Sequence, residues 1–311
     1  MTPRRTLLSK NSWEDRLEIL KTLAEACRLC PRECGARRLQ TERGECGAGR
    51  DISLVSYGPH HGEESCLSGW QGSGTLFFGH CNLHCIYCQN ADISQNHLLA
   101  QRCETTPDVV ASAMLALQTL GCHNINCVSP THQLYGIVQA CQLATEQGLW
   151  LPLVYNTHSY DSLEALKAIA GIVDIYLPDL KYANSRVAER LGAPADYPGR
   201  ARAAITEMYR QVGGLRLDER GLAVQGVLVR LLVLPNNLSG TIESLEWLRS
   251  TLGTDVGVNI MAQYHPAYCT YLEPQLQRRL YAEEYVPIVE KAFQLGFKYV
   301  VFDKSLTSIR S

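Results

Sequence analysis

The sequence has no surplus of charge of either sign and no long hydrophobic run. Its 29 lysines and arginines nearly balance its 31 aspartates and glutamates, which leaves a net charge of −2. This balance gives no general reason to expect a nucleic acid or an anionic membrane surface as a partner. The early basic residues Arg4, Arg5 and Lys10 precede no long apolar stretch, so we expect neither a signal peptide nor a membrane-spanning segment.

Cysteine is almost missing from the second half of the chain. Of the 13 cysteines, 12 precede residue 142 and only Cys269 follows it. An odd number of cysteines without a secretory signal indicates reduced thiols and metal ligation, not disulfides, so we expect a reducing cytoplasm. Seven of the cysteines form two motifs. We expect the other six to be small, buried, apolar residues: Cys66, Cys103, Cys122, Cys127, Cys141 and Cys269.

Length and hydrophobic patterning predict the α/β class. A chain of 311 residues can form one large α/β domain with a small appendage, or two ordinary domains. From Thr75 onward, short apolar runs alternate with helical segments, which is the pattern of βαβ units and a parallel sheet. Such units close into whole or partial barrels, whose active sites lie at the carboxyl ends of the strands.

The expected elements divide the chain at about residue 70. Residues 1–70 should form an irregular, Cys-rich metal-binding module with one amphipathic helix, and 71–311 the barrel-like domain. We predict strands at 75–79, 124–128, 151–155, 172–177, 227–233, 256–262 and 298–302. Helices are expected at 13–27, 106–121, 133–148, 161–170, from the fourth strand to 212, at 241–252 and at 283–296, with a hairpin at 214–226.

Three cysteines lie within eight residues, directly after the first predicted strand. Cys81, Cys85 and Cys88 have the spacing CxxxCxxC, with Tyr87 just before the last cysteine. Three thiolates can ligate only three corners of a four-iron cluster, whereas proteins that use a cluster only to carry electrons normally supply four. The motif therefore indicates chemistry at the cluster, with a small molecule completing the coordination of the fourth iron.

At these residues the chain resembles the radical S-adenosylmethionine (radical SAM) superfamily. In that family S-adenosylmethionine chelates the open iron of a 4Fe–4S cluster. The reduced cluster cleaves it to a 5′-deoxyadenosyl radical, which removes a hydrogen atom from the substrate. The resemblance implies a partial (β/α)6-type TIM barrel over 71–311 and a one-electron reductant such as flavodoxin or ferredoxin. Scarce cysteine after residue 142 excludes the C-terminal auxiliary-cluster domain of some members.

Further stretches resemble the branch named after the pyruvate formate-lyase activating enzyme, in particular its poorly characterised relatives with an N-terminal cysteine motif. Each stretch precedes, follows or ends a predicted strand, where a barrel would place contacts to the cosubstrate. The stretches are Gly72–Thr75, Cys88–Asn90, Val154–Thr157, Tyr176–Lys181, Val229–Pro235 and Gln263–Pro266. The resemblance therefore covers nearly the whole chain.

The resemblance implies contacts between these stretches and S-adenosylmethionine. Tyr87 would lie near the adenine, and Asn156 offers both a donor and an acceptor to the ribose or methionyl group. Arg230 would pair with the methionyl carboxylate through two parallel hydrogen bonds. Asp179 and Lys181 can point toward a polar ligand from one strand end, and His265 could bind the ribose.

One segment departs from the family pattern. Many radical SAM enzymes carry Gly-Gly-Glu after the second strand, where it binds the amino group of the cosubstrate. Here the sequence at that place is Val128–His132. Backbone carbonyls together with the hydroxyls of Ser129 or Thr131 could substitute for it.

A second cysteine set lies near the amino terminus. Cys27, Cys30, Cys34 and Cys46 follow the pattern C-x2-C-x3-C-x11-C, with glycines around the last cysteine. Four thiolates suit a tetrahedral zinc ion, and close pairs with glycines are usual in zinc knuckles. They equally suit a second iron–sulfur cluster, or they could pack together without a metal.

The reaction expected from the resemblance is hydrogen abstraction, with a glycine of a glycyl-radical enzyme as the leading substrate. A free-standing enzyme that acts on a small molecule or peptide, such as an epimerase, is nearly as well supported, because a fold says little about its substrate. From another class, a non-catalytic iron–sulfur electron carrier or scaffold stays open. The short connection from Cys46 to Thr75 further predicts that the amino-terminal module covers or narrows the site.

Overall fold

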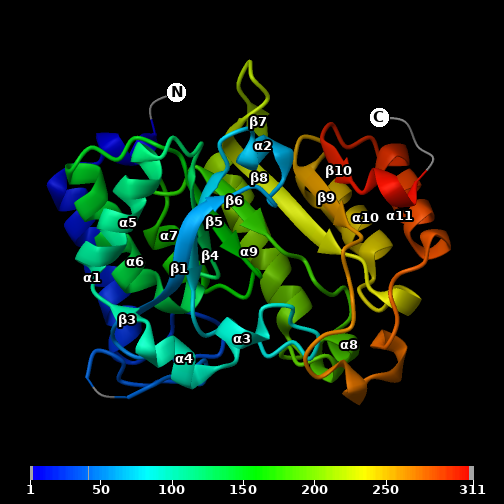
Figure 1. Cartoon of the computed structure of the whole chain (residues 1–311), viewed down its shortest axis with the longest axis horizontal. Helices are drawn as coiled ribbons and strands as arrows, with labels where there is room; N and C mark the ends of the chain where they lie inside the picture. Colours follow the sequence, from blue (N-terminus) through cyan, green and yellow to red (C-terminus); the bar gives the residue numbers. More distant parts are fainter. Residues whose placement is uncertain (1–2, 41, 308–311) are drawn as a thin grey trace.

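One large, mostly parallel sheet organises the molecule in a mixed α/β fold (Figure 1). The structure is a computed structural model that describes residues 3–40 and 42–307. The sheet has ten strands, nine of them in the order β10-β9-β8-β6-β5-β4-β2-β1-β3, while β7 pairs with β8. Its two edges, β10 and β3, are not paired with each other in the described residues, so the sheet is open and not a closed barrel.

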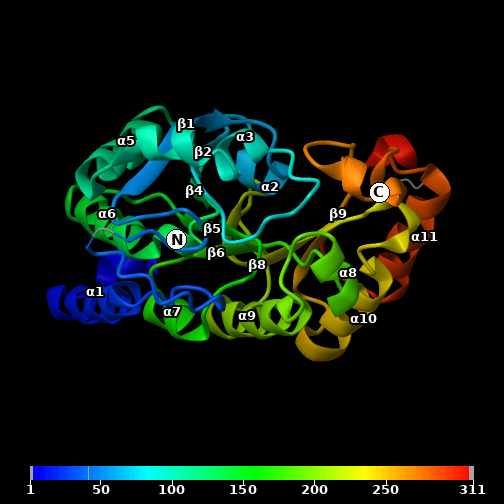
Figure 2. The same cartoon turned by 90° about the horizontal axis from the view of Figure 1, so that it is seen from below.

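Seven parallel strands follow one another across the sheet in chain order. They are β2 (Ser73–Phe78), β4 (Ile125–Val128), β5 (Leu153–Thr157), β6 (Ile175–Pro178), β8 (Ala223–Leu232), β9 (Gly257–Met261) and β10 (Val300–Phe302). Each corresponds to a predicted strand, with ends shifted by up to four residues. Because all seven run the same way, their carboxyl ends meet at one edge of the sheet, the edge seen from below in Figure 2.

Helices connect and cover these strands, as expected for βαβ units. The helix of Pro107–Thr119, for example, has proline at its first position, where the missing N–H leaves no bond unmade. Figure 2 shows α7, α9 and α10 side by side along the outside of the sheet. The helices are α5 (Pro107–Thr119), α6 (Leu134–Glu146), α7 (Leu163–Ala168), α8 (Ser185–Arg190), α9 (Tyr197–Val212), α10 (Thr241–Leu252) and α11 (Ala282–Gln294).

The prediction that residues 1–70 are irregular is correct only in part. The predicted amphipathic helix is α1 (Lys10–Glu25), which packs on α6 and α7 and buries Leu20 and Leu23 completely. Residues 52–60, however, form strand β1 (Ile52–His60), which pairs antiparallel with β2. Gly58 and Pro59 lie inside β1, and both resemble turn signals in the sequence, which is why the strand was not predicted.

Short elements complete the sheet and its two ends. The predicted hairpin is present as β7 (Arg216–Leu217) paired with β8, and it protrudes at the top of Figure 1. The short helix α2 (Ser65–Ser68) lies in the β1–β2 connection, so the predicted boundary near residue 70 falls between two paired strands. At the opposite end lie α3 (Ala91–Ser94), α4 (His97–Arg102) and the edge strand β3 (Glu104–Thr105).

None of the helices within 3–40 and 42–307 has both the length and the apolar character needed to cross a membrane.

Candidate functional site

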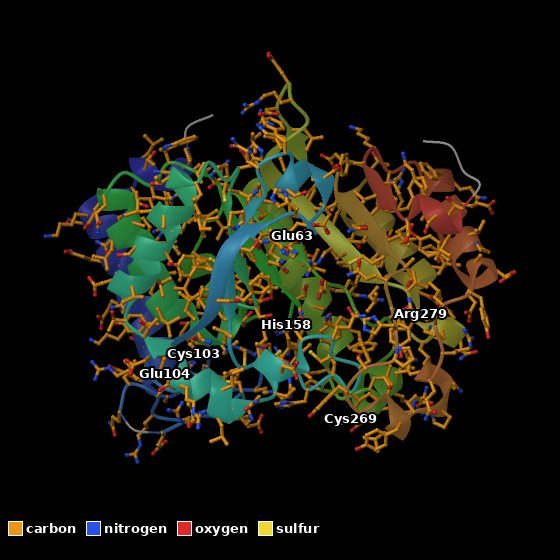
Figure 3. All side chains as sticks on the ribbon, in the orientation of Figure 1. Glu63, Cys103, Glu104, His158, Cys269 and Arg279 are labelled. Atoms are coloured by element: carbon orange, nitrogen blue, oxygen red, sulfur yellow. The ribbon has the colours of Figure 1, made fainter. Side chains whose placement is uncertain are left out.

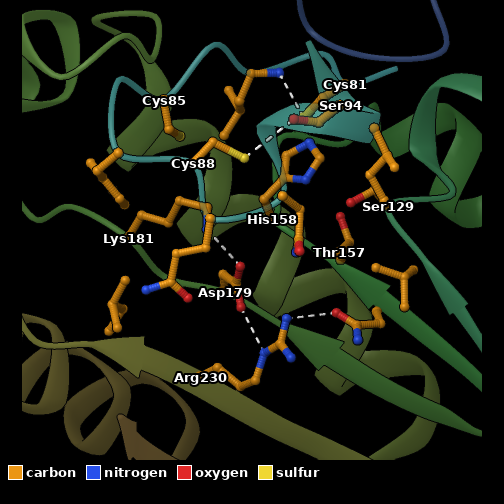
Figure 4. A pocket seen from close by; sticks show the side chains of 18 of the residues that line it. Cys81, Cys85, Cys88, Ser94, Ser129, Thr157, His158, Asp179, Lys181 and Arg230 are labelled. Carbon is orange, nitrogen blue, oxygen red and sulfur yellow. Dashed lines mark hydrogen bonds and ion pairs between the residues drawn. The ribbon is translucent and has the colours of Figure 1, made fainter. Parts of the chain in front are cut away.

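A pocket of about 230 Å³ opens at the carboxyl ends of the parallel strands (Figure 4). Its walls come from the loop after β2 and from the ends of β4, β5, β6, β8 and β9. The structure thus brings together predicted residues from five separate stretches of the chain. Those that line the pocket are Cys81, Cys85, Tyr87, Cys88, Ser129, Asn156, Asp179, Lys181 and Arg230.

The cysteine loop is held by backbone contacts on several sides. A Cβ on Gly79 would collide with Ser53 Oγ and lie 2.7 Å from Ala100 Cβ, so only glycine fits where the loop leaves β2. The N–H of His84 donates to Gly192 O (3.2 Å), and that of Ile86 donates to Leu191 O (3.1 Å). These bonds tie the loop to the end of α8. The close packing at Gly79 and these backbone hydrogen bonds therefore fix the position of the cysteine loop.

The three thiols of this loop face the same pocket but do not converge on one point. Cys88 Sγ lies 3.2 Å from Ser94 Oγ, and the Leu83 N–H points at Cys81 Sγ (3.3 Å). In the part of the chain that the structure describes, no three Cys, His, Asp or Glu side chains meet as a ready-made metal site. Burial raises the pKa of Cys81 and Cys85, while the positive charge of Lys181 opposes that rise. Three soft thiols around an open space suit an iron–sulfur cluster.

A compact group of charges forms the opposite wall. Asp179 accepts from Lys181 Nζ (2.7 Å) through one oxygen and from Arg230 Nε (2.7 Å) through the other, while Arg230 Nη2 donates to Asn156 Oδ1 (2.6 Å). Burial by itself would raise the pKa of Asp179, but the two cations outweigh it and lower the pKa to about 2. Arg230, expected to pair with a carboxylate of the cosubstrate, is therefore already paired within the protein.

Glu63 adds a second carboxylate behind Arg230, and sequence reasoning missed it. It comes from the connection between β1 and β2, and its Oε2 lies 3.7 Å from Arg230 Nη1. Figure 3 shows it near the centre of the molecule. Burial raises the pKa of Glu63 to about 7, although the charge of Arg230 acts against this rise. Nothing local in the sequence marks this residue, because its partner is distant in the chain.

His158 is a second residue of this site that the sequence did not single out. It is 5% exposed, lines the pocket, and lies between the cysteine loop and the charged group in Figure 4. Its Nε2 contacts Asn82 Oδ1, while the Asn82 amide donates to Tyr160 O (2.9 Å). Because Asn82 Oδ1 can only accept, His158 Nε2 carries the hydrogen and Nδ1 is an acceptor. Burial, with help from Lys181, lowers the pKa of His158 to about 3, so the ring is neutral.

The structure does not bring two of the predicted contact residues to the pocket. Thr131 is fully buried in the short 3-10 helix Thr131–Gln133, and its hydroxyl donates to Asp161 Oδ1 (2.7 Å). His265 is exposed on a loop, where its Nδ1 lies 3.1 Å from Gln89 Nε2. Tyr87 does line the pocket, but its ring is buried against those of Tyr182 and Tyr264. These three residues differ in the direction in which their side chains point. A sequence motif does not reveal that direction.

The amino-terminal cysteines lie at the same end of the sheet as the pocket, but outside it. Arg32 Nε, two residues after Cys30, donates to the backbone oxygen of Asn82 in the cysteine loop (2.6 Å). None of the described residues from 27 to 46 lines the pocket. The module contacts the cysteine loop through this bond, and the expectation that it covers or narrows the site stays a prediction.

The remaining six cysteines are mostly packed as expected. Cys66, Cys122, Cys127 and Cys141 are buried, whereas Cys103 and Cys269 are only half-buried. None of the six lines the pocket.

One relative places the chain in a family. No family model matches the sequence. The chain is 30% identical over 290 residues to the uncharacterized protein MJ0674 of Methanocaldococcus jannaschii, and the aligned region covers 91% of this chain and 78% of that protein. Such identity over most of both sequences is enough to establish common descent. The chain therefore belongs to the same family as MJ0674.

Proposed function

We propose that this protein is a radical SAM enzyme, resembling the pyruvate formate-lyase activating enzyme, on a partial (β/α)6-type barrel. The observation that carries the proposal is that Cys81, Cys85 and Cys88 face one pocket with Asp179, Lys181, Arg230 and Asn156. A site for electron transfer alone needs no such polar wall opposite its thiols. The free thiols suit a reducing cytoplasm as the compartment.

The bound group would be a 4Fe–4S cluster held by Cys81, Cys85 and Cys88, with S-adenosylmethionine as its ligand. When reduced, this group supplies the electron that cleaves the cosubstrate and generates the 5′-deoxyadenosyl radical. The electron would come from a reductant such as flavodoxin or ferredoxin.

The remaining residues would bind and orient the cosubstrate. Lys181 and Asn156 offer N–H donors on the pocket wall, while His158 Nδ1 offers an acceptor to an N–H or O–H of the ligand. Asp179 holds Lys181 and Arg230 in place through paired, charge-assisted hydrogen bonds. The low exposure of these groups keeps water away from the reacting atoms.

For the substrate, we propose a glycine hydrogen on a glycyl-radical partner protein. None of the described residues from 27 to 46 lines the pocket, which supports the entry of a backbone loop from a partner. The test is incubation with a partner whose glycines carry deuterium at Cα. Transfer of deuterium from this partner into 5′-deoxyadenosine supports the proposal. Transfer only from deuterated small molecules or free peptides favours an epimerase-type enzyme.

Activity itself is tested by anaerobic reconstitution with iron and sulfide, followed by reduction with S-adenosylmethionine. We expect 5′-deoxyadenosine and methionine to form, and the Cys81→Ala, Cys85→Ala and Cys88→Ala variants to form neither. Cys103→Ala is the matched control, since Cys103 lies outside the pocket, and it should retain activity. A protein that binds the cluster but not S-adenosylmethionine would instead be an electron carrier or scaffold.

A further inference from the structure

The fold brings two of the four amino-terminal thiols to one glycine and leaves the other two nearby, although in the described residues no three of them meet as a ready-made metal site. A Cβ placed on Gly44 would lie 3.3 Å from Cys34 Sγ and 3.5 Å from Cys46 Sγ, so these two thiols approach the same point. Cys27 and Cys30 are close enough to Cys46 for their charges to interact with it. Cys34 is exposed, and the other three are buried. Cysteines spread over twenty residues of chain thus share one small region.

Two tight backbone turns present these thiols. The N–H of Glu33 donates to Cys30 O (3.1 Å), and the N–H of Gly47 donates to Gly44 O (2.8 Å). Glu33 has φ +44° and Gly47 has φ +85°, so the chain reverses sharply beside a cysteine in both places. Paired cysteines on such turns are typical of structural zinc sites.

A buried arginine next to these thiols has no carboxylate partner. Arg38 is 4% exposed; its Nε and Nη2 donate to Gly49 O (3.1 and 2.7 Å), and its Nη1 donates to His132 O and lies 3.8 Å from Cys27 Sγ. No aspartate or glutamate of the described chain forms an ion pair with it. Buried charges are expected to be paired, so the neighbouring thiols are the available source of negative charge.

Free thiols would not supply that charge. A protonated thiol carries no charge, whereas a metal-bound thiolate carries a negative charge. Binding of a divalent cation would deprotonate all four thiols, with the protons released to solvent and no change in oxidation state. Four thiolates and one zinc ion carry a net charge of −2, and the guanidinium of Arg38 would offset half of it.

We propose that Cys27, Cys30, Cys34 and Cys46 bind one zinc ion, that Arg38 compensates the charge of this site, and that the site braces the loop of Cys81. The brace follows from two contacts. Arg32 donates to Asn82 O (2.6 Å), and Arg38 donates to the backbone oxygen of His132, whose ring lies 2.9 Å from Gly79 O. The amino-terminal segment thus contacts the cysteine loop directly at Asn82 and, through His132, indirectly at Gly79.

Metal analysis of the full chain tests the ion, independently of the proposed radical chemistry. A Cys81→Ala/Cys85→Ala/Cys88→Ala triple variant cannot hold the radical cluster, so any metal bound belongs to the second site. We expect one zinc per chain, lost on additional replacement of Cys30 and Cys46 by Ser. Iron with sulfide in place of zinc, or no metal at all, would overturn the proposal.

The role of Arg38 is tested in the same triple variant by competition with a zinc chelator. Residues that support metal ligands typically change metal affinity by roughly 10- to 100-fold when replaced, and we expect a loss of that size for Arg38→Met. Arg38→Lys, which keeps the charge, should recover part of it. Arg37→Met is the matched control, because Arg37 is exposed and pairs with Glu42. Equal zinc affinity in Arg38→Met and Arg37→Met would show that Arg38 does not compensate the charge of the site.

Hydrogen exchange tests the brace. Cys34→Ser should lower zinc occupancy without disturbing the interior, because Cys34 is exposed. We expect faster amide exchange in residues 79–88 of this variant and unchanged exchange in β8 and β9. Unchanged exchange in 79–88 in the zinc-depleted variant would contradict the brace, and so would a rise spread evenly over the chain.

Discussion

At the scale of single residues, Asp179 joins the two cations of the pocket wall. Its two carboxylate oxygens accept from Lys181 and Arg230, all three side chains being largely shielded from solvent. Removing one member of such a buried network leaves an uncompensated charge, which costs far more than the net stabilisation that the intact network contributes. Stability and ligand binding should therefore both depend on this carboxylate.

Asp179→Asn should lower the free energy of unfolding by roughly 3–5 kcal/mol, as for other broken buried ion pairs. Urea unfolding of the metal-free protein measures it. Glu14→Gln is the control, since Glu14 belongs to an exposed pair at 3.8 Å, and exposed pairs contribute about 0–1 kcal/mol. Similar losses in both variants would mean that the network carries no special share of the stability.

The difference in stability between wild type and Asp179→Asn should change with pH in a defined direction. The pKa of Asp179 in the folded protein is lowered to about 2, below the value of about 3.9 for an unfolded chain. Its stabilisation is therefore fully present above about pH 4 and is lost as the pH falls toward 2. The stability difference between wild type and Asp179→Asn should shrink over that interval; a difference that grows there would contradict the assignment.

His158 should be a neutral ring with its hydrogen on Nε2. Nitrogen NMR of the metal-free protein, with His158→Gln to assign the signal, should show this tautomer unchanged from pH 5 to 8, because burial lowers the pKa of His158 to about 3.

Since His158 Nδ1 is an acceptor in the pocket, His158→Phe should weaken S-adenosylmethionine binding by roughly tenfold, the value of about one hydrogen bond. Titration of this ring near neutral pH would refute the fixed tautomer.

At the scale of elements, the junction between α8 and the cysteine loop controls where the three thiols lie. Gly192 ends α8 with φ +89°, and its carbonyl accepts from the His84 N–H. A Cβ there would collide with His84 O and lie 2.9 Å from the His84 carbonyl carbon. Glycine is required at this position for both its conformation and its lack of a side chain.

Gly192→Ala should destabilise the protein by roughly 2–5 kcal/mol, because a left-handed conformation costs a residue about 1–2 kcal/mol and overpacking adds about 1–3. It should also lower cluster loading, measured as iron and sulfide per chain after reconstitution. Gly148→Ala provides the control, since Gly148 has φ +94° but nothing within 4 Å of its Cβ position. If both variants load and unfold alike, the loop does not depend on this close approach.

At the scale of the whole molecule, the amino-terminal region is part of the main fold. β1 extends the sheet, α1 covers α6 and α7, and Arg5 reaches the start of the parallel strands. The Arg5 guanidinium is fully buried; its Nη1 donates to Asp174 Oδ2 (2.9 Å), and its Nη2 donates to the backbone oxygen of Leu151. Contacts this far apart in sequence indicate that residues 3–27 fold together with the sheet.

Arg5→Met should therefore lower the free energy of unfolding of the entire protein by about 3–5 kcal/mol, because it leaves Asp174 as an unpaired buried charge. The double variant Arg5→Met/Asp174→Asn should regain most of this loss, since Asn removes the charge and still accepts from the Leu153 N–H. Urea unfolding followed by both tryptophan fluorescence and circular dichroism should give one transition. Two separate transitions would indicate an independent amino-terminal module.

The sequence by itself determined the order of the parallel strands and the residues of the cysteine loop. Hydrophobic periodicity and the positions of turn residues are local properties of the sequence. All seven parallel strands and the 214–226 hairpin could therefore be predicted from them. The motif around Cys81 marked the loop after the first parallel strand, and the resemblance to the radical SAM family marked Asn156, Asp179 and Arg230 at strand ends. Parallel strands in chain order then bring those ends to one edge.

Only the tertiary structure decided how side chains from distant segments meet. The pairing of β1 with β2, the approach of Glu63 to Arg230 and the burial of Arg38 beside Cys27 each join residues with no local signal between them. Likewise, Thr131 turns into the interior toward Asp161, whereas His158 turns into the pocket. Such directions depend on the competition between burial and hydrogen bonding in the assembled fold, which local sequence patterns do not encode.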